Sequence, residues 1–125
     1  MSRILIVDNE VPVRVMLADM LRGTGYNVSV ARSGFEAIEM IPAIKPDLVM
    51  LDVNMPGFDG WATLKHLRAE FRDTRVLMMS GADHQRQALE LGAVAFLDKP
   101  YRHADVLRVV ASSLGELPGQ PARAA

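Results

Sequence analysis

Five short apolar runs recur along the chain, and each is bounded by polar or turn-forming residues. Four of these runs are continuously apolar, which is typical of strands that are covered on both faces inside a parallel sheet. The second run instead alternates apolar with polar residues, which predicts a half-exposed strand at the edge of the sheet. The runs therefore predict five strands, at residues 4–7, 26–31, 48–51, 76–79 and 94–97.

Between and after these runs, apolar residues recur at the spacing of an amphipathic helix. Strands that alternate with helices favour a doubly wound α/β fold, because right-handed crossovers place helices on both faces of a parallel sheet. We therefore expect a flavodoxin-like, five-stranded parallel sheet with five helices, in the order 2-1-3-4-5, which puts the alternating strand at an edge. The helical spacing is carried by Val13, Leu17, Met20 and Leu21; Ala37, Ile38 and Ile41; Trp61, Leu64, Leu67 and Phe71; residues 85–91; and Val106, Val109, Val110 and Leu114.

The chain of 125 residues has the size of one domain. We expect this domain to span residues 1–116, and the proline- and glycine-rich residues 117–125 to form a flexible tail or the stub of a linker. The absence of cysteine excludes disulfides, thiolate zinc sites and a cysteine nucleophile, and it fits a cytoplasmic location. A formal net charge of −1 and a pI near 6.3 argue against direct nucleic-acid binding. Because no apolar run is long enough to cross a bilayer, we expect no membrane partner.

Polar side chains follow four of the predicted strands. Ligands bind beyond the carboxyl ends of parallel strands at the point where the winding reverses, so Asp8 and Asp52 should converge on one pocket. Carboxylate oxygens are hard ligands, which favours Mg²⁺ (or Mn²⁺). Lys99 and Ser80 suit phosphoryl oxygens. Asp52 ends the predicted central strand and precedes an exposing Asn-Met-Pro-Gly loop, so it is the better candidate to form an aspartyl phosphate.

Four motifs, in this order and at this spacing, resemble the receiver domain of bacterial two-component response regulators. They are ILIVDNE, LVMLDVNMPGFDG, LMMSGA and GAVAFLDKPY, and the resemblance covers residues 3 to 116. It implies a module of a phosphorelay whose Asp52 takes a phosphoryl group, with Mg²⁺, from a sensor histidine kinase or a histidine phosphotransfer protein. Such a module is not an enzyme, apart from Mg²⁺-assisted self-phosphorylation and autodephosphorylation.

The same resemblance assigns roles within the pocket. Asp8 is similar to the family's acidic-pocket residue, Asn54 to the position whose backbone carbonyl ligates the metal, and Lys99 to the phosphate-sensing lysine. Pro100 resembles the family's cis-proline.

The resemblance also implies a switch. The Ser80 hydroxyl would move toward the phosphoryl group, Phe96 would fill the space it leaves, and the surface of the fourth helix, fifth strand and fifth helix would change. Phe96 has a plainer interpretation as a core aromatic. In the family that this chain resembles, the positions of Asn54 and Ala82 flank the route of the hydrolytic water, so the small Ala82 predicts a short phosphate lifetime.

Asn9 departs from the family pattern, which usually has a second acidic residue at this position. An amide oxygen can still ligate a hard cation, weakly or through a water, and Glu10 would partly compensate through a water. We therefore expect a working site with weak magnesium affinity. Two alternatives stay open: a pseudo-receiver that serves as a docking scaffold, and, less favoured, an aspartyl-phosphate phosphatase, whose second aspartate two positions beyond Asp8 is missing here.

Several other polar residues receive structural interpretations. Asp59 is expected to cap the third helix, and Pro12 to lie in the first turn of the first helix. Capping of the first helix is also an alternative role for Asp8 and Glu10. The three histidines have no ligand spacing and are interpreted as surface residues on helices: His66, His84 and His103.

Overall fold

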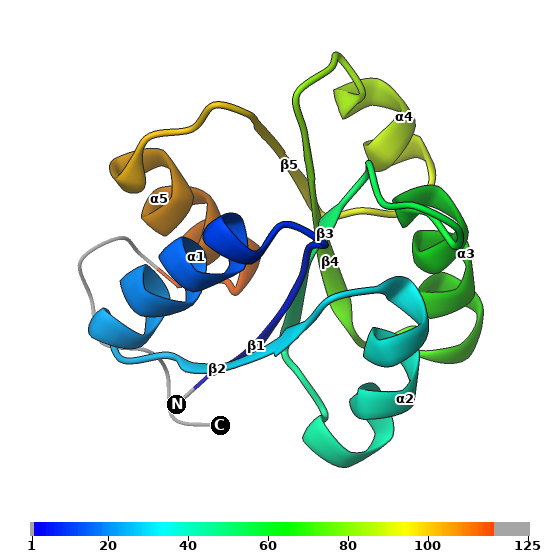
Figure 1. The fold of residues 1–125 in the computed structure, drawn as a ribbon, viewed down its shortest axis with the longest axis horizontal. Helices are drawn as coiled ribbons and strands as arrows, with labels where there is room; N and C mark the ends of the chain where they lie inside the picture. Colours follow the sequence, from blue (N-terminus) through cyan, green and yellow to red (C-terminus); the bar gives the residue numbers. More distant parts are fainter. Residues whose placement is uncertain (1, 117–125) are drawn as a thin grey trace.

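The computed structural model describes residues 2–116 and contains the predicted alternation of strands and helices (Figure 1). The predictions for residues 117–125 lie outside the described residues. Each predicted strand is present, with bounds that shift by at most one residue. The elements are β1 (Arg3–Val7), α1 (Val11–Gly23), β2 (Asn27–Ala31), α2 (Gly34–Ile44), β3 (Leu48–Asp52), α3 (Gly60–Glu70), β4 (Arg75–Ser80), α4 (Gln85–Glu90), β5 (Ala95–Asp98) and α5 (His103–Ser113).

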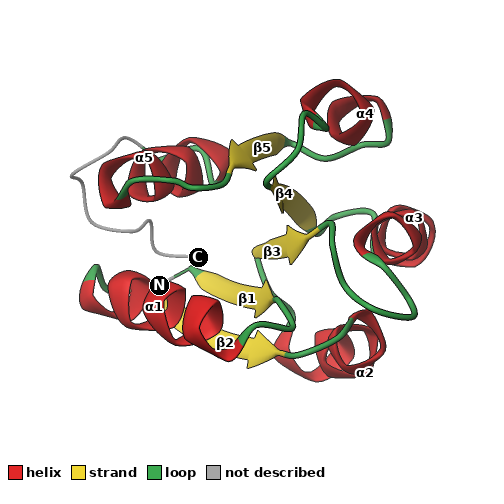
Figure 2. Ribbon diagram, turned by 45° about the horizontal axis from the view of Figure 1, so that its top comes forward, coloured by secondary structure: helices red, strands yellow, loops and turns green. Residues whose placement is uncertain are grey.

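The five strands form one parallel sheet in the order β2-β1-β3-β4-β5, as predicted. Figure 2 shows α1 and α5 on one face of the sheet and α2, α3 and α4 on the other. The winding reverses between β1 and β3, so the carboxyl ends of these two neighbouring strands form the switch point of the fold. None of the helices within residues 2–116 is long and apolar enough to cross a membrane.

Alternation of side chains along the strands divides the core into two layers. Ile4 and Ile6 of β1 pack in the layer beneath α1 and α5, whereas Leu5 and Val7 pack in the layer beneath α2, α3 and α4. All four side chains are buried, because helices cover both faces of this strand. The continuous apolar runs of β1, β3 and β4 follow from this arrangement.

The two edges of the sheet differ in how well the sequence anticipates them. The alternating strand β2 lies at one edge, as predicted. The run at 94–97 was expected to be covered on both faces, and this is wrong. β5 forms the other edge, as the predicted order requires, and its faces are incompletely covered. Val94 is 46% exposed, and Ala95 and Phe96 are only half-buried. An apolar strand therefore lies at the surface between α4 and α5.

Local signals fix the helix starts. The side chain of Asp59 accepts a hydrogen bond from the Ala62 N–H at 2.9 Å, so the predicted cap of α3 is confirmed. Pro12 lies in the first turn of α1, as expected. Glu10 precedes α1 but makes no side-chain cap hydrogen bond, which leaves its carboxylate available to the neighbouring pocket.

Candidate functional site

Asp8 and Asp52 lie side by side at the switch point, where the sheet register pairs Val7 with Leu51 directly before them. The side chains of both are buried, with residue exposures of 0% and 1%. Two buried carboxylates repel each other and are costly to keep ionised without a cation. The predicted convergence of these residues is therefore present, together with the electrostatic problem that it creates.

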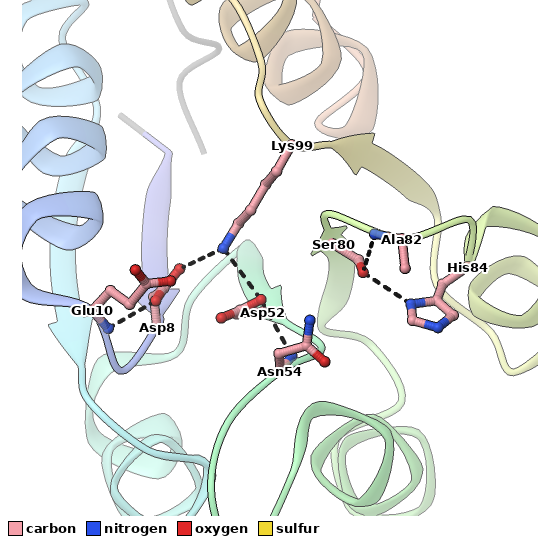
Figure 3. A network of polar contacts seen from close by, with 8 residues as sticks. All are labelled: Asp8, Glu10, Asp52, Asn54, Ser80, Ala82, His84 and Lys99. Carbon is pink, nitrogen blue, oxygen red and sulfur yellow. Dashed lines mark hydrogen bonds and ion pairs between the residues drawn. The ribbon is translucent and has the colours of Figure 1, made fainter.

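Lys99 supplies the positive charge between the two carboxylates (Figure 3). It follows β5, whose carboxyl end meets this edge of the sheet, and its Nζ lies 3.3 Å from Asp8 Oδ2 and 3.3 Å from Asp52 Oδ1. The Lys99–Pro100 peptide bond that follows is cis. One ammonium group thus contacts both acidic residues of the pocket.

The pKa values of the pocket reflect this balance. Burial and, next, the charge of Asp8 raise the pKa of Asp52, and this outweighs the opposing effects of Lys99 and the Asn54 N–H. For Lys99, burial disfavours the charged ammonium, but the carboxylates of Asp52 and Asp8 outweigh it and raise the pKa. The ionised Asp52 carboxylate is therefore held in an environment that disfavours its charge.

Glu10 joins the two aspartates. One carboxylate oxygen from each of Asp8, Glu10 and Asp52 lies within 4.8 Å of the others. The loop is held in place because the Glu10 N–H donates to Asp8 Oδ1 at 2.9 Å. Asn9, between them in sequence, is exposed. The chain thus places a third carboxylate at the pocket through Glu10.

Two backbone N–H groups approach the functional side chains from the loops that follow β3 and β4. The Asn54 N–H donates to Asp52 Oδ1 at 3.3 Å, and the Ala82 N–H donates to Ser80 Oγ at 3.1 Å. The side chains of Asn54 and Ala82 themselves are exposed. Phe96 is half-buried and packs against the layer beneath α2, α3 and α4.

His84 is the residue that the sequence interpretation missed. Its expected place at the surface is wrong, because it is half-buried and its Nδ1 lies 2.9 Å from Ser80 Oγ (Figure 3). Its ring also meets the ring of Trp61 edge-on, with centroids 5.3 Å apart. The Ser-Gly dipeptide at 80–81 is a turn signal, but it does not show that the chain returns His84 to Ser80. His66 is likewise half-buried, whereas His103 is exposed.

Tyr101 is a second residue whose place the sequence did not reveal. It is half-buried and packs against the layer beneath α1 and α5. Burial, followed by the negative charges of Asp8, Asp52 and Glu10, raises the pKa of its phenol to about 12. The hydroxyl therefore stays neutral at physiological pH and adds no charge to the pocket.

Comparisons with known proteins agree with this geometry. Residues 4–111 match the sequence model of the response regulator receiver domain. Sporulation initiation phosphotransferase F of Bacillus subtilis is 33% identical over 103 residues, which cover 80% of this chain and 83% of that protein. A protein-glutamate methylesterase/protein-glutamine glutaminase of Archaeoglobus fulgidus is 41% identical over 104 residues, which cover 78% of this chain but 30% of that protein.

A solved structure matches the fold. It is the response regulator protein TrrA from Thermotoga maritima in complex with Mg²⁺-BeF. The TM-score is 0.83 at 29% sequence identity, and the match covers 90% of this chain and 99% of that chain.

Proposed function

Because the chain belongs to the family of response regulator receiver domains of two-component systems, we propose that Asp52 accepts a phosphoryl group from a histidine kinase or a histidine phosphotransfer protein. The observation that carries this proposal is the position of Asp52. It is buried at the end of the central strand, contacts Lys99, and has a pKa raised by its surroundings. Receiver domains are in general not enzymes, so the chemistry proposed for this one is its own modification.

The transfer itself is a substitution at phosphorus. An Asp52 Oδ oxygen would form the new P–O bond while the P–N bond of the donor phosphohistidine breaks. The electron pair of the P–N bond would leave with the imidazole. Such a transfer needs mainly alignment and charge stabilisation from the protein. Lys99 is close enough to Asp52 to serve phosphoryl oxygens once they are attached there.

The donor chemistry of the pocket fits magnesium. The cluster offers carboxylate oxygens from three residues, and Mg²⁺ prefers oxygen ligands. Asp8, Asp52 and the backbone carbonyl of Asn54 are the proposed ligands, with Glu10 and Asn9 contributing weakly or through water. When bound, the ion would neutralise charge on the transferred group.

The balance between Asn9 and Glu10 is expected to set the metal affinity. Asn9→Asp adds a carboxylate beside the cluster and should tighten Mg²⁺ binding about tenfold, whereas Glu10→Gln removes one and should weaken it about tenfold. Isothermal titration with MgCl₂ measures both constants. Asp98→Asn, which removes an exposed carboxylate outside the cluster, serves as the control. An unchanged affinity in Glu10→Gln would exclude Glu10 from the site.

Acetyl phosphate tests the proposed function without a partner protein. We expect intact mass spectrometry to show one added phosphoryl group in the presence of MgCl₂ and none in excess chelator. Peptide mapping should locate the group on Asp52. An adduct on another residue would contradict the assignment. The lack of any adduct, also with a phosphorylated histidine donor, would favour the docking scaffold that Asn9 suggests.

Ser80, Phe96 and Ala82 complete the proposal. Ser80 would donate a hydrogen bond to the phosphoryl group. Phe96 would then fill the space that the hydroxyl leaves, because both residues face the layer beneath α2, α3 and α4. The exposed, small Ala82 would leave the route of the hydrolytic water open. In the structure, the Ser80 hydroxyl contacts Ala82 and His84 and has no hydrogen bond to Asp52 among those described.

A further inference from the structure

The Ser80 hydroxyl is engaged on the side of the β4–α4 loop. Ser80 is fully buried, accepts a hydrogen bond from the Ala82 N–H, and lies 2.9 Å from His84 Nδ1. Figure 3 shows its Oγ directed toward Ala82 and His84, while Lys99 and Asp52 form a separate set of contacts. In the described structure the hydroxyl therefore belongs to the His84 network.

This arrangement limits what the hydroxyl can do. Serine has a single O–H donor, and one lone pair of Ser80 Oγ already accepts from Ala82. Where His84 Nδ1 is the acceptor, the bond to it uses the only proton of Ser80. Where Nδ1 carries the proton, His84 donates and occupies the second lone pair. In either tautomer the hydrogen bond holds Ser80 on the His84 side.

His84 is itself well positioned to hold this bond. It precedes α4, and its backbone carbonyl accepts from the Ala88 N–H at 3.0 Å, so its position is tied to the start of that helix. Its ring contacts the Trp61 ring at an interplanar angle of 86°. The backbone of His84 is thus tied to α4, and its ring packs against Trp61 of α3.

We propose that His84 is a positioning residue that retains the Ser80 hydroxyl away from the phosphoryl site in the unmodified protein. Phosphorylation would then exchange the Ser80–His84 hydrogen bond for one from Ser80 to a phosphoryl oxygen, and this would free His84 to move relative to Trp61. The inference rests on the proposed function of Asp52. It adds a residue that sets how readily the modified state forms.

Two variants separate the hydrogen bond from the ring packing. His84→Phe keeps a ring against Trp61 but loses Nδ1, so beryllofluoride with Mg²⁺ should bind about fivefold more tightly, as expected for the loss of one competing hydrogen bond. His84→Asn keeps a polar atom near the position of Nδ1 and should restore the affinity of the wild type. Calorimetric titration with beryllofluoride measures each constant, and thermal unfolding verifies that each variant is folded.

Three further measurements exclude a merely structural effect. His66→Phe changes a half-buried histidine beside Phe71, outside the Ser80 network, and should leave the affinity unchanged. In a Ser80→Ala background, His84→Phe should have no effect, because the bond is already absent. The emission of Trp61, the only tryptophan, should change when beryllofluoride binds to the wild type and should change less in Ser80→Ala.

The outcomes distinguish this inference from the proposed function. A wild type that binds no beryllofluoride would overturn the role of Asp52 and, with it, the role of His84. If the wild type binds beryllofluoride and His84→Phe binds it with the same affinity, only the role of His84 is overturned. Weaker binding in His84→Phe would also overturn it, because His84 would then support the modified state.

Discussion

Replacement of Asp52 by asparagine is expected to abolish the phosphoryl adduct and, at the same time, to stabilise the fold. The amide cannot serve as the nucleophile, so acetyl phosphate with Mg²⁺ should add no phosphoryl group. The substitution also removes a buried negative charge beside Asp8 that its surroundings disfavour. Lys99 keeps Asp8 as an ion-pair partner at 3.3 Å, so no charge is left unpaired.

The stabilisation should depend on pH in a defined direction. Because the pKa of Asp52 is higher in the folded protein than its ordinary value of 3.8, the folded state binds more protons over the interval between these two pKa values. The free energy of unfolding of the wild type should therefore fall as the pH rises through this interval. Asp52→Asn lacks this dependence, so its advantage should grow with pH and disappear in acid.

Urea unfolding in chelator, at several pH values, measures the effect, and intact mass measures the adduct. Asp98→Asn is the matched control because Asp98 is an exposed aspartate at the end of β5. This control should be phosphorylated normally. A variant Asp52→Asn that is less stable than the wild type at neutral pH would contradict the electrostatic description of the pocket.

The second large effect is expected from Gly60→Ala at the first residue of α3. A Cβ at this position would lie 2.3 Å from the backbone oxygen of Asp52 and 2.7 Å from the Cα of Val53. Both neighbours are backbone atoms of the strand end that carries the proposed phosphoacceptor, so no flexible side chain can move aside. We expect a loss of about 3 kcal/mol in the free energy of unfolding.

Gly23→Ala provides the control for this substitution. Gly23 is the last residue of α1, and a Cβ there would meet no atom within 4 Å. The free energy of unfolding should stay the same or rise by about 0.5 kcal/mol. Denaturant unfolding of both variants measures the difference. A Gly60→Ala protein as stable as Gly23→Ala would show that the start of α3 can move away from β3.

Much of this molecule could be predicted because its signals are periodic or topological. The alternation of Ile4, Leu5, Ile6 and Val7 between two helix layers makes an unbroken apolar run, and the winding of the sheet brings Asp8 to Asp52. The exposure of β5 was missed, although the predicted strand order places this strand at an edge. An apolar run does not show how completely the neighbouring helices cover its two faces.

The contacts of His84 were unpredictable for a different reason. They depend on the path of a short loop and on Trp61, which approaches from another helix. The hydrophobic periodicity of a sequence predicts helices and strands, but it does not predict contacts within a loop or between a loop and a distant helix. The sequence predicted that Glu10 lies near the two aspartates. Only the structure shows that one oxygen of each of the three carboxylates lies within 4.8 Å of the others.

Lys99 acts as an internal counterion for the pocket of the unmodified protein. Its ammonium already balances part of the negative charge of Asp8 and Asp52, so a divalent cation would enter a site that contains a positive charge. A bound divalent cation would share these carboxylates with Lys99, and the repulsion between the two cations would weaken the ion pairs of Lys99. The ammonium would stay within reach of Asp52, where an incoming phosphoryl group would bring the next negative charge. Metal binding would thereby make Lys99 more available to phosphoryl oxygens.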